Sequence, residues 1–261
     1  MKKIKLGIYE ESTLQFGTRS IGCVFPINAH EMISTTTREI RRFEGEEIKE
    51  CVKFPFSCAC FISGVGFVAA HTVSGSEIWI MRSSDLSHPI LTNYKTGHTC
   101  VYHMIYSPKS KSIITIGSGI KVFKISWQQK GSHFFSSNFE VTITLRSEFA
   151  EDYDASLLNP PPFDEENERL FLPTSEGICA FNLDGDLLSF VSKLPADNNT
   201  SYSFCPQTGK ILSFDPVDGL CLWKKDGTID KRITVTSIII IGLRFIDSEN
   251  VICLNTSYSL Y

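Results

Sequence analysis

The chain has 261 residues, 42% of them hydrophobic, and a formal net charge of −4 at pH 7. This balance is typical of a globular protein with a large core, and a mildly negative chain is a poor ligand for a nucleic-acid backbone. The N-terminus carries lysines but no long apolar stretch, and the most apolar short run, 238–241, is too short to span a bilayer. We therefore expect neither a signal peptide nor membrane insertion.

The first patterned segment is Lys3–Tyr9, in which apolar and polar residues alternate. This period predicts a strand with one exposed face. The segment precedes the first repeat described below, and the last repeat stops at its third strand. We therefore expect Lys3–Tyr9 to pair antiparallel with Asn255–Tyr261 as a fourth strand, which would remove an open sheet edge. The alternative is that the sequence ends inside a longer protein and that further repeats are missing.

The segment Cys100–Lys124 is the clearest repeating unit. Two alternating or β-branched runs, Val101–Tyr106 and Ile113–Ile116, are separated by a polar turn, and Gly117–Gly119 forms a tight turn before a third run at Ile120–Phe123. Short β-rich runs joined by tight turns predict an antiparallel meander.

The third run has a signature, in which a turn residue is followed by Ile or Leu, two further residues and an aromatic side chain. The signature recurs at Glu39–Phe43, Gly119–Phe123, Gly177–Phe181 and Gly219–Trp223. Two weaker copies lie at 77–81 and 257–261. The Ile, Leu or Tyr positions are 40, 78, 120, 178, 220 and 258, so the gaps are 38, 42, 58, 42 and 38 residues. A period near forty with about four strands per unit is typical of β-propeller blades. A β-sandwich also has many short strands, but nothing in its architecture requires this spacing.

The fold prediction is therefore an all-β, single domain over 1–261, a β-propeller of six readable blades made of four-stranded antiparallel sheets. The expected blades cover about 20–50, 51–93, the segment around Cys100–Lys124, 154–192, 201–234 and 237–261. Equivalent hairpins are expected at Asn182–Gly185 and Lys224–Gly227, where Asp-Gly favours a tight turn. The aromatic residues of the repeat are expected to pack between blades: Phe43, Phe123, Phe181, Trp223 and Tyr261.

The longest gap contains an acidic and proline-rich insertion at 128–167. We expect a loop at Trp127–Phe135, an outer strand at Phe139–Arg146 and a second loop at Glu148–Arg169 that contains three consecutive prolines. A connecting loop exposed to solvent is the simpler interpretation. The functional interpretation is an acidic lip for a partner with a basic surface, carried by six carboxylates: Glu151, Asp152, Asp154, Asp164, Glu165 and Glu166.

The nine cysteines include no Cys-x-x-Cys pair. Seven fall in predicted strands among apolar neighbours, where we expect buried reduced thiols: Cys58, Cys60, Cys100, Cys179, Cys205, Cys221 and Cys253. This usage predicts the cytoplasm or another reducing intracellular compartment.

Two stretches carry a family resemblance. Gly97-His98 followed by Ile105–Pro108 and Ile116–Phe123 resembles a blade of the WD-repeat β-propellers, and Tyr202–Pro206 with Gly219–Trp223 resembles another. The likeness covers nearly the whole chain but is degenerate, because no Trp-Asp dipeptide occurs and Gly-His occurs once. Because of these departures, we expect the His–Asp–Trp hydrogen-bond network of the family to be absent or partial. Six blades are readable in the sequence, whereas seven is the commonest number in the family.

No nucleotide-binding loop, hydrolase motif, zinc motif or calcium loop is present. We therefore expect no cofactor, no metal and no catalytic residue. The resemblance implies a non-catalytic scaffold that binds other proteins, as a subunit of a larger intracellular assembly of cytoskeletal, ciliary or trafficking type. The alternative is a propeller enzyme or a ligand-binding lectin with its site at the central channel, which would need two or more convergent carboxylates there.

Overall fold

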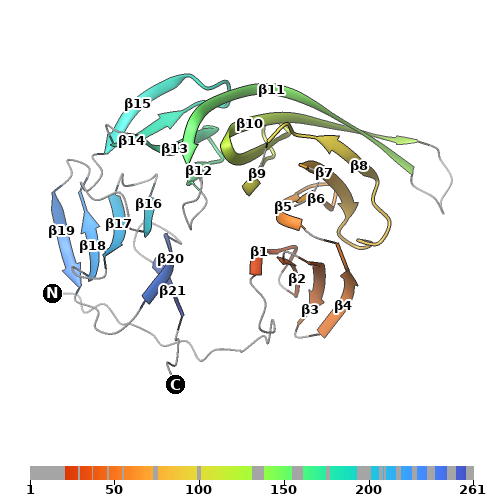
Figure 1. The fold of residues 1–261 in the computed structure, drawn as a ribbon, viewed down its shortest axis with the longest axis horizontal. Coiled ribbons are helices and arrows are strands. Elements are labelled where there is room, and N and C mark those ends of the chain that lie inside the picture. The colour runs from red at the N-terminus through yellow and green to blue at the C-terminus, as the bar shows by residue number, and fades with distance from the viewer. Residues whose placement is uncertain are drawn as a thin grey trace.

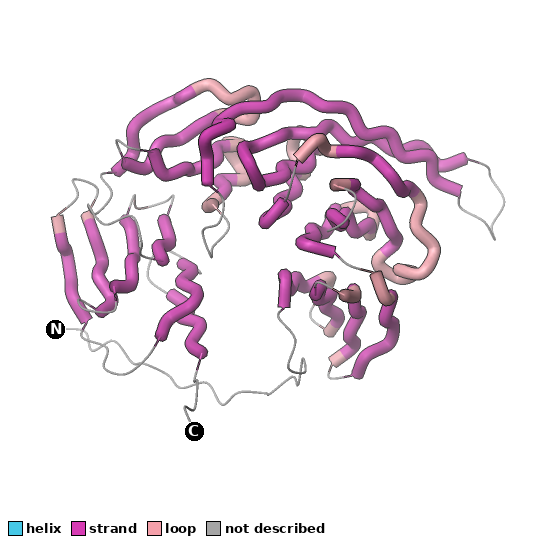
Figure 2. The backbone as a smooth tube through the Cα atoms, in the orientation of Figure 1, coloured by secondary structure: helices cyan, strands magenta, loops and turns pink. Residues whose placement is uncertain are grey.

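The described part of the chain is built from β-strands. The computed structural model describes residues 21–28, 30–36, 38–45, 47–54, 56–72, 76–98, 101–130, 138–154, 161–174, 177–192, 201–205, 208, 210–215, 219–224, 228–233, 239–245 and 251–256. No helix occurs among these residues (Figure 2). The strands pair antiparallel with their neighbours in the sequence, which confirms the all-β prediction.

The first two sheets each contain four strands in sequence order. The first sheet consists of β1 (Ile21–Pro26), β2 (Glu31–Thr36), β3 (Ile40–Glu44) and β4 (Glu47–Val52). The second sheet consists of β5 (Phe56–Ile62), β6 (Phe67–Thr72), β7 (Glu77–Arg82) and β8 (Leu91–Lys95). The second predicted unit was expected to begin at Cys51, but Cys51 pairs with Arg41 and belongs to β4.

The third sheet consists of β9 (Val101–Ser107), β10 (Ser112–Lys130) and β11 (Asn138–Asp154). The first part of β10 pairs with β9, and the part from Ser118 onward pairs with β11. The amide of Ile125 donates to the carbonyl of Lys111 at 2.9 Å. Fourteen residues of extended strand would span roughly 46 Å, so β10 turns back on itself. Gly119, with φ +90°, lies at the predicted turn. Because β10 supplies two antiparallel segments, the sheet contains four extended segments, like the other four-stranded sheets.

The fourth and fifth sheets repeat the four-strand order, and a strand pair follows them. The fourth sheet consists of β12 (Phe163–Asp164), β13 (Arg169–Thr174), β14 (Gly177–Phe181) and β15 (Leu187–Ser192). The fifth consists of β16 (Ser201–Cys205), β17 (Lys210–Asp215), β18 (Gly219–Trp223) and β19 (Ile229–Ile233). The pair is β20 (Ile239–Phe245) and β21 (Val251–Thr256). The predicted pairing of Lys3–Tyr9 with Asn255–Tyr261 lies outside the described residues, except for the end of β21.

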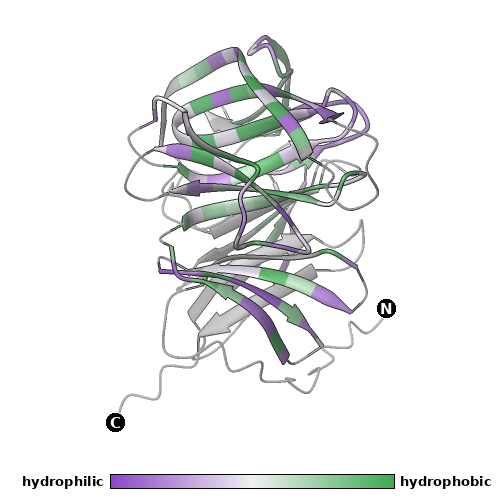
Figure 3. Cartoon of the chain, turned by 90° about the vertical axis from the view of Figure 1, so that its right-hand side faces the viewer, coloured by the Kyte–Doolittle hydropathy of each residue, from purple (hydrophilic) through white to green (hydrophobic). Residues whose placement is uncertain are grey.

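Figure 1 shows the sheets following one another in chain order along a curve. The first strand of each sheet lies toward the middle, and the last strand, such as β4, β11, β15 or β19, lies on the outside. Hydrophilic and hydrophobic residues alternate along many strands when the molecule is seen from the side (Figure 3). Strand alternation sends neighbouring residues to opposite faces of a sheet, so each sheet offers two faces for packing.

Both faces of the inner sheets are buried. On β6, Phe67 and Ala69 pack with the third sheet, whereas Val68 and Ala70 pack with the first. On β10, Ile113 packs with the second sheet and Ile114 with the fourth. The sheets are therefore stacked face to face, with an apolar layer at each junction. Five of the cysteines expected in strands are buried free thiols within these layers or beside them: Cys58, Cys60, Cys179, Cys205 and Cys221.

The inserted segment differs from the prediction. Trp127–Lys130 was expected in a loop but continues β10, and its partners run from Asn138 to Val141 on β11. The Trp127 and Phe139 rings pack against Phe67 of the second sheet, with ring centroids 6.4 and 5.0 Å away. Burial of these aromatic rings explains why the hairpin extends beyond the predicted end of its strands.

The hairpin between β14 and β15 provides a test of this packing. Gly185 has φ +92°, and a Cβ atom there would lie 2.8 Å from the Cβ of Phe149 on β11. Gly64 has φ +86°, but a Cβ atom would meet nothing within 4 Å. We expect Gly64→Ala to lower the free energy of unfolding by about 1 kcal/mol from backbone strain alone. Gly185→Ala should cost about 2–4 kcal/mol, because overpacking adds to the strain.

Denaturant unfolding of both variants, followed by tryptophan fluorescence, measures the difference. Equal losses of stability in the two variants would contradict the close contact between the hairpin and Phe149.

Candidate functional site

The six acidic residues predicted to form one loop are divided between two elements. Glu151, Asp152 and Asp154 lie on β11, which continues to Asp154. Asp164 ends β12, and Glu165 and Glu166 occupy the exposed turn that follows. The loop prediction at Glu148–Arg169 was therefore wrong for its first part. The strand continues there because Glu148 and Phe149 pair with Lys121 and Ile120 of β10.

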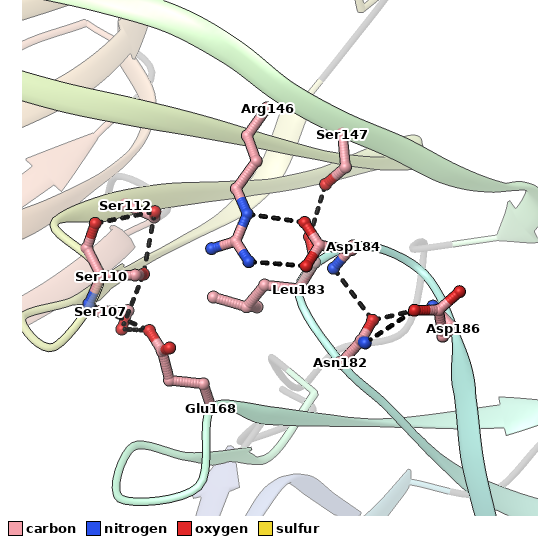
Figure 4. A network of polar contacts seen from close by, with 10 residues as sticks. All are labelled: Ser107, Ser110, Ser112, Arg146, Ser147, Glu168, Asn182, Leu183, Asp184 and Asp186. Carbon is pink, nitrogen blue, oxygen red and sulfur yellow. Dashed lines mark hydrogen bonds and ion pairs between the residues drawn. The ribbon is translucent and has the colours of Figure 1, made fainter.

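An ion pair joins β11 to the hairpin of the fourth sheet (Figure 4). The Arg146 guanidinium donates from Nε to one oxygen of the Asp184 carboxylate at 2.7 Å and from Nη2 to the other at 2.8 Å. This contact raises the pKa of Arg146 and lowers that of Asp184. Beside it, the Ser147 hydroxyl donates to the carbonyl of Leu183. Two-point recognition fixes the orientation of the hairpin, although an exposed pair of this kind contributes only about 1 kcal/mol.

A second contact joins the turn after β9 to the turn after β12 (Figure 4). The Glu168 carboxylate accepts from the Ser107 hydroxyl at 2.5 Å and from the Ser110 amide at 3.1 Å. Burial acts to raise the pKa of Glu168, and these hydrogen bonds outweigh it, so the pKa is lowered. The Lys109 ammonium donates to the carbonyl of Glu166 at 2.9 Å. The exposed acidic turn is thereby held in a fixed position.

The first and second sheets are joined in the same way. The Glu50 carboxylate of β4 accepts from the amides of Leu86 and Ser87, both at 2.9 Å, and from the Ser87 hydroxyl at 2.7 Å. A charged acceptor with several donors makes a strong hydrogen-bonded contact. At two of the junctions between sheets, a carboxylate of one sheet thus accepts hydrogen bonds from a connecting turn of its neighbour.

Two buried histidines lie at the junction of the second and third sheets. The Ser57 hydroxyl is 3.0 Å from Nδ1 of His71, and Nε2 of His71 is 3.3 Å from the Thr96 hydroxyl. Nε2 of His98 is 2.9 Å from the Thr115 hydroxyl. Burial lowers the pKa of both histidines to about 4, aided by the other histidine at His71 and by Lys121 at His98. Both rings are therefore neutral at pH 7.

This histidine pair does not have the geometry of a hydrolytic site. A serine nucleophile of the triad type needs a carboxylate on the far nitrogen of its histidine, and His71 has the Thr96 hydroxyl there. The innermost strands β1, β5, β9, β12, β16 and β20 contain one carboxylate among them, Asp164. No group of three or more metal-ligating side chains was found among the residues that the structure describes. In the same residues, no helix is long and apolar enough to cross a membrane.

Among the residues that the structure describes, β15 carries three of the exposed large apolar side chains. Leu187 is 61% exposed, Leu188 48% and Phe190 47%. The register of β15 against β14 shifts between Ala180 and Phe181, which leaves Leu188 as an extra residue. Ser189 and Phe190, which pair in register with β14, are exposed as well, so both faces of this last strand of the sheet meet solvent. In the sequence, the signal for this surface is the Leu187-Leu188 pair that follows the Asp184-Gly185 turn, and the expectations above did not include it.

The repeated aromatic residues lie in different surroundings. Phe43 is buried, and Phe123 is buried in the layer between the second and third sheets, 5.7 Å from the ring of Tyr94. Phe181 is half-buried and stacks on Phe149 of the third sheet at 6.2 Å. Trp223 is half-buried against residues of the fourth sheet, and its Nε1 donates to the Ser213 hydroxyl at 2.8 Å. The last member, Tyr261, lies outside the described residues.

The buried histidines predict an acid-sensitive fold. Between pH 6.5 and pH 4 the unfolded chain binds protons that the folded protein does not, so stability is present above pH 6.5 and is lost as the pH falls toward 4. A pKa difference of this size corresponds to about 3 kcal/mol per histidine. We expect the double variant His71→Gln, His98→Gln to lose less stability between pH 7 and pH 4 than the wild type.

Denaturant unfolding at a series of pH values measures the wild type and the double variant. Parallel pH profiles for the wild type and the double variant would contradict the burial of neutral rings.

The chain was also compared with known proteins. No family model matches it, and no curated protein matches its sequence. The geometry of its own residues therefore carries the functional argument.

Proposed function

We propose that the stacked sheets are the blades of a β-propeller with degenerate WD-type repeats. Three observations support this: the sheets follow one another in chain order, the strand order within each four-stranded sheet is the same, and both faces of the inner sheets are buried. His98 and Trp223, which lie in the stretches that carry the resemblance, each make a hydrogen bond with a hydroxyl group, that of Thr115 and that of Ser213, and these bonds support the proposal. In this proposal β20 and β21 belong to the sixth blade, and the N-terminal strand completes it.

We further propose that the protein is a non-catalytic scaffold that binds other proteins, as a subunit of a larger intracellular assembly. The observation that carries the proposal is the exposed apolar edge formed by Leu187, Leu188 and Phe190. Soluble chains seldom leave three large apolar side chains together on an exposed outer strand unless a partner covers them. An exposed carboxylate borders the apolar edge, because Asp186 directly precedes it, whereas Asp184 is already paired with Arg146.

The charged rim indicates what kind of partner fits. The turn after β12 adds exposed carboxylates, Glu165 and Glu166, at the same end of the fourth sheet, since alternate turns of an antiparallel sheet lie at one end. A partner with an apolar patch bordered by lysine or arginine matches this surface in both respects. A cytoskeletal, ciliary or trafficking assembly is the setting that the WD-type resemblance implies.

The test is a pair of matched surface variants. Leu187→Asp combined with Phe190→Asp removes the apolar edge, and Ile229→Asp changes an exposed residue on another outer strand, β19. Because all three side chains are exposed, both variants should keep the wild-type unfolding temperature. Proteins cross-linked to the wild type in cell extract should be recovered with Ile229→Asp but reduced by about tenfold with the double variant. Equal recovery with all three proteins would contradict the proposal.

A further inference from the structure

The hairpin between β14 and β15 requires glycine at position 185. Gly185 has φ +92°, and a Cβ atom there would lie 2.8 Å from the Cβ atom of Phe149 on β11. A residue with a side chain would be strained by the backbone conformation and would also collide with the Phe149 ring. The residue before it, Asp184, is exposed in the turn. The packing of the hairpin therefore places an Asp-Gly dipeptide at the surface.

An Asp-Gly dipeptide can rearrange without an enzyme. The amide nitrogen of the glycine attacks Cγ of the aspartate, so that a C–N bond forms, a C–O bond of the carboxyl group breaks, and the amide proton leaves with that oxygen as water. Water then opens the resulting succinimide ring at either of its carbonyl groups. One opening restores aspartate, and the other gives isoaspartate, in which the main chain is one carbon atom longer. Glycine favours the attack because no side chain shields its amide.

The Arg146 side chain of β11 controls the carboxyl group in this reaction. Its guanidinium donates to both carboxylate oxygens of Asp184, at 2.7 and 2.8 Å (Figure 4), and this two-point contact fixes the orientation of the carboxylate. The contact also lowers the pKa of Asp184, with a smaller contribution from Lys124. Ring closure needs the protonated carboxyl group, because an ionised carboxylate repels the nucleophile and does not release water. The ion pair therefore disfavours the reaction in two ways.

The nucleophile of the reaction is also held in place. The Gly185 amide donates to the carbonyl of Asn182 at 3.2 Å. The side-chain Oδ1 of Asn182 accepts from the amides of Asp184 and Asp186, at 3.0 and 2.8 Å. These hydrogen bonds act on the main chain of the turn, whereas the contact with Arg146 acts on the Asp184 carboxylate itself. Loss of Arg146 would thus free the reacting carboxyl group while the turn keeps its own hydrogen bonds.

We propose that Asp184 is a site of spontaneous isomerisation to isoaspartate, and that Arg146 keeps this rearrangement slow in the folded protein by holding the Asp184 carboxylate. The ion pair then has a chemical role besides its small contribution to stability. Isoaspartate at this position would lengthen the main chain directly before β15 and remove the carboxylate from its place beside Arg146. The inference does not depend on the scaffold proposal, because it concerns the chemistry of the turn alone.

The experiment ages the full chain for several weeks at body temperature and mildly acidic pH, as the wild type and as the variants Arg146→Gln, Arg146→Lys and Glu148→Gln. Glu148→Gln is the matched control, since it removes the ion pair between Glu148 of β11 and Lys121 and leaves Arg146 in place. The proteins are then digested with an endoprotease that cleaves before aspartate but not before isoaspartate. Mass spectrometry of the peptides measures the isoaspartate formed at position 184.

Arg146→Gln should form isoaspartate at Asp184 at least about fivefold faster than the wild type, because the carboxyl group is protonated more often and is free to turn toward the Gly185 amide. Arg146→Lys keeps the charge but loses the two-point contact, so its rate should lie between those two. Glu148→Gln should match the wild type. The sequence contains a second such dipeptide, Asp226-Gly227, and isoaspartate formation there should be the same in all the proteins.

Equal rates at Asp184 in the wild type and in Arg146→Gln would overturn the inference. A parallel rise at Asp226 in Arg146→Gln would also overturn it, since the substitution would then act by loosening the whole protein. A free peptide with the sequence of Asn182–Leu188 should isomerise faster than the folded wild type. Equal rates in the peptide and the wild type would show that the fold gives Asp184 no protection.

Discussion

The structure depends on the burial of both faces of each inner sheet. A single sheet of alternating residues exposes an apolar face to water, and the second, third and fourth sheets carry apolar residues on both faces. Each of these sheets is therefore stable only between two neighbours, and the junctions are interdependent. This requirement explains the near-continuous apolar strands, such as Phe67–Thr72, in which every residue is buried. It also explains why the repeat in the sequence is a repeat of whole sheets.

Polar groups within this stack are satisfied by a few specific contacts. Where turns meet at the ends of the sheets, carboxylates such as Glu50 and Glu168 accept amide and hydroxyl hydrogen bonds from the neighbouring sheet. Within the layers, His71 and His98 are held neutral and bonded to hydroxyl groups. The two kinds of contact respond to acid differently. Protonation of a carboxylate weakens the hydrogen bonds that it accepts at the surface. Protonation of a buried imidazole instead places an uncompensated charge in the core.

Much of the fold could be predicted from the sequence because its signals are local. The aromatic motif locates β3, β14 and β18, and the Asp-Gly turn at Gly185 adopts the expected left-handed conformation. The site was less predictable because it depends on pairing between distant segments. The acidic stretch after Arg146 looks like a loop by composition, yet its pairing with Ser118–Val122 makes it part of a strand. The exposure of Leu187 and Leu188 follows from the place of β15 as the last strand of its sheet, which no composition rule reports.

The outer strands of the stacked sheets differ in how their exposed backbone edges are protected from pairing with other chains. Sheets that bury both faces leave only their outer strands to meet water, and four of these strands are broken by register shifts within every two or three residue pairs. On β15 the shift leaves Leu188 without a partner on β14, and Leu187, Leu188 and Phe190 are all exposed. On β11 the stretch Asn138–Leu145 pairs with β10 without a shift, so this edge lacks the interruption that the other outer strands have.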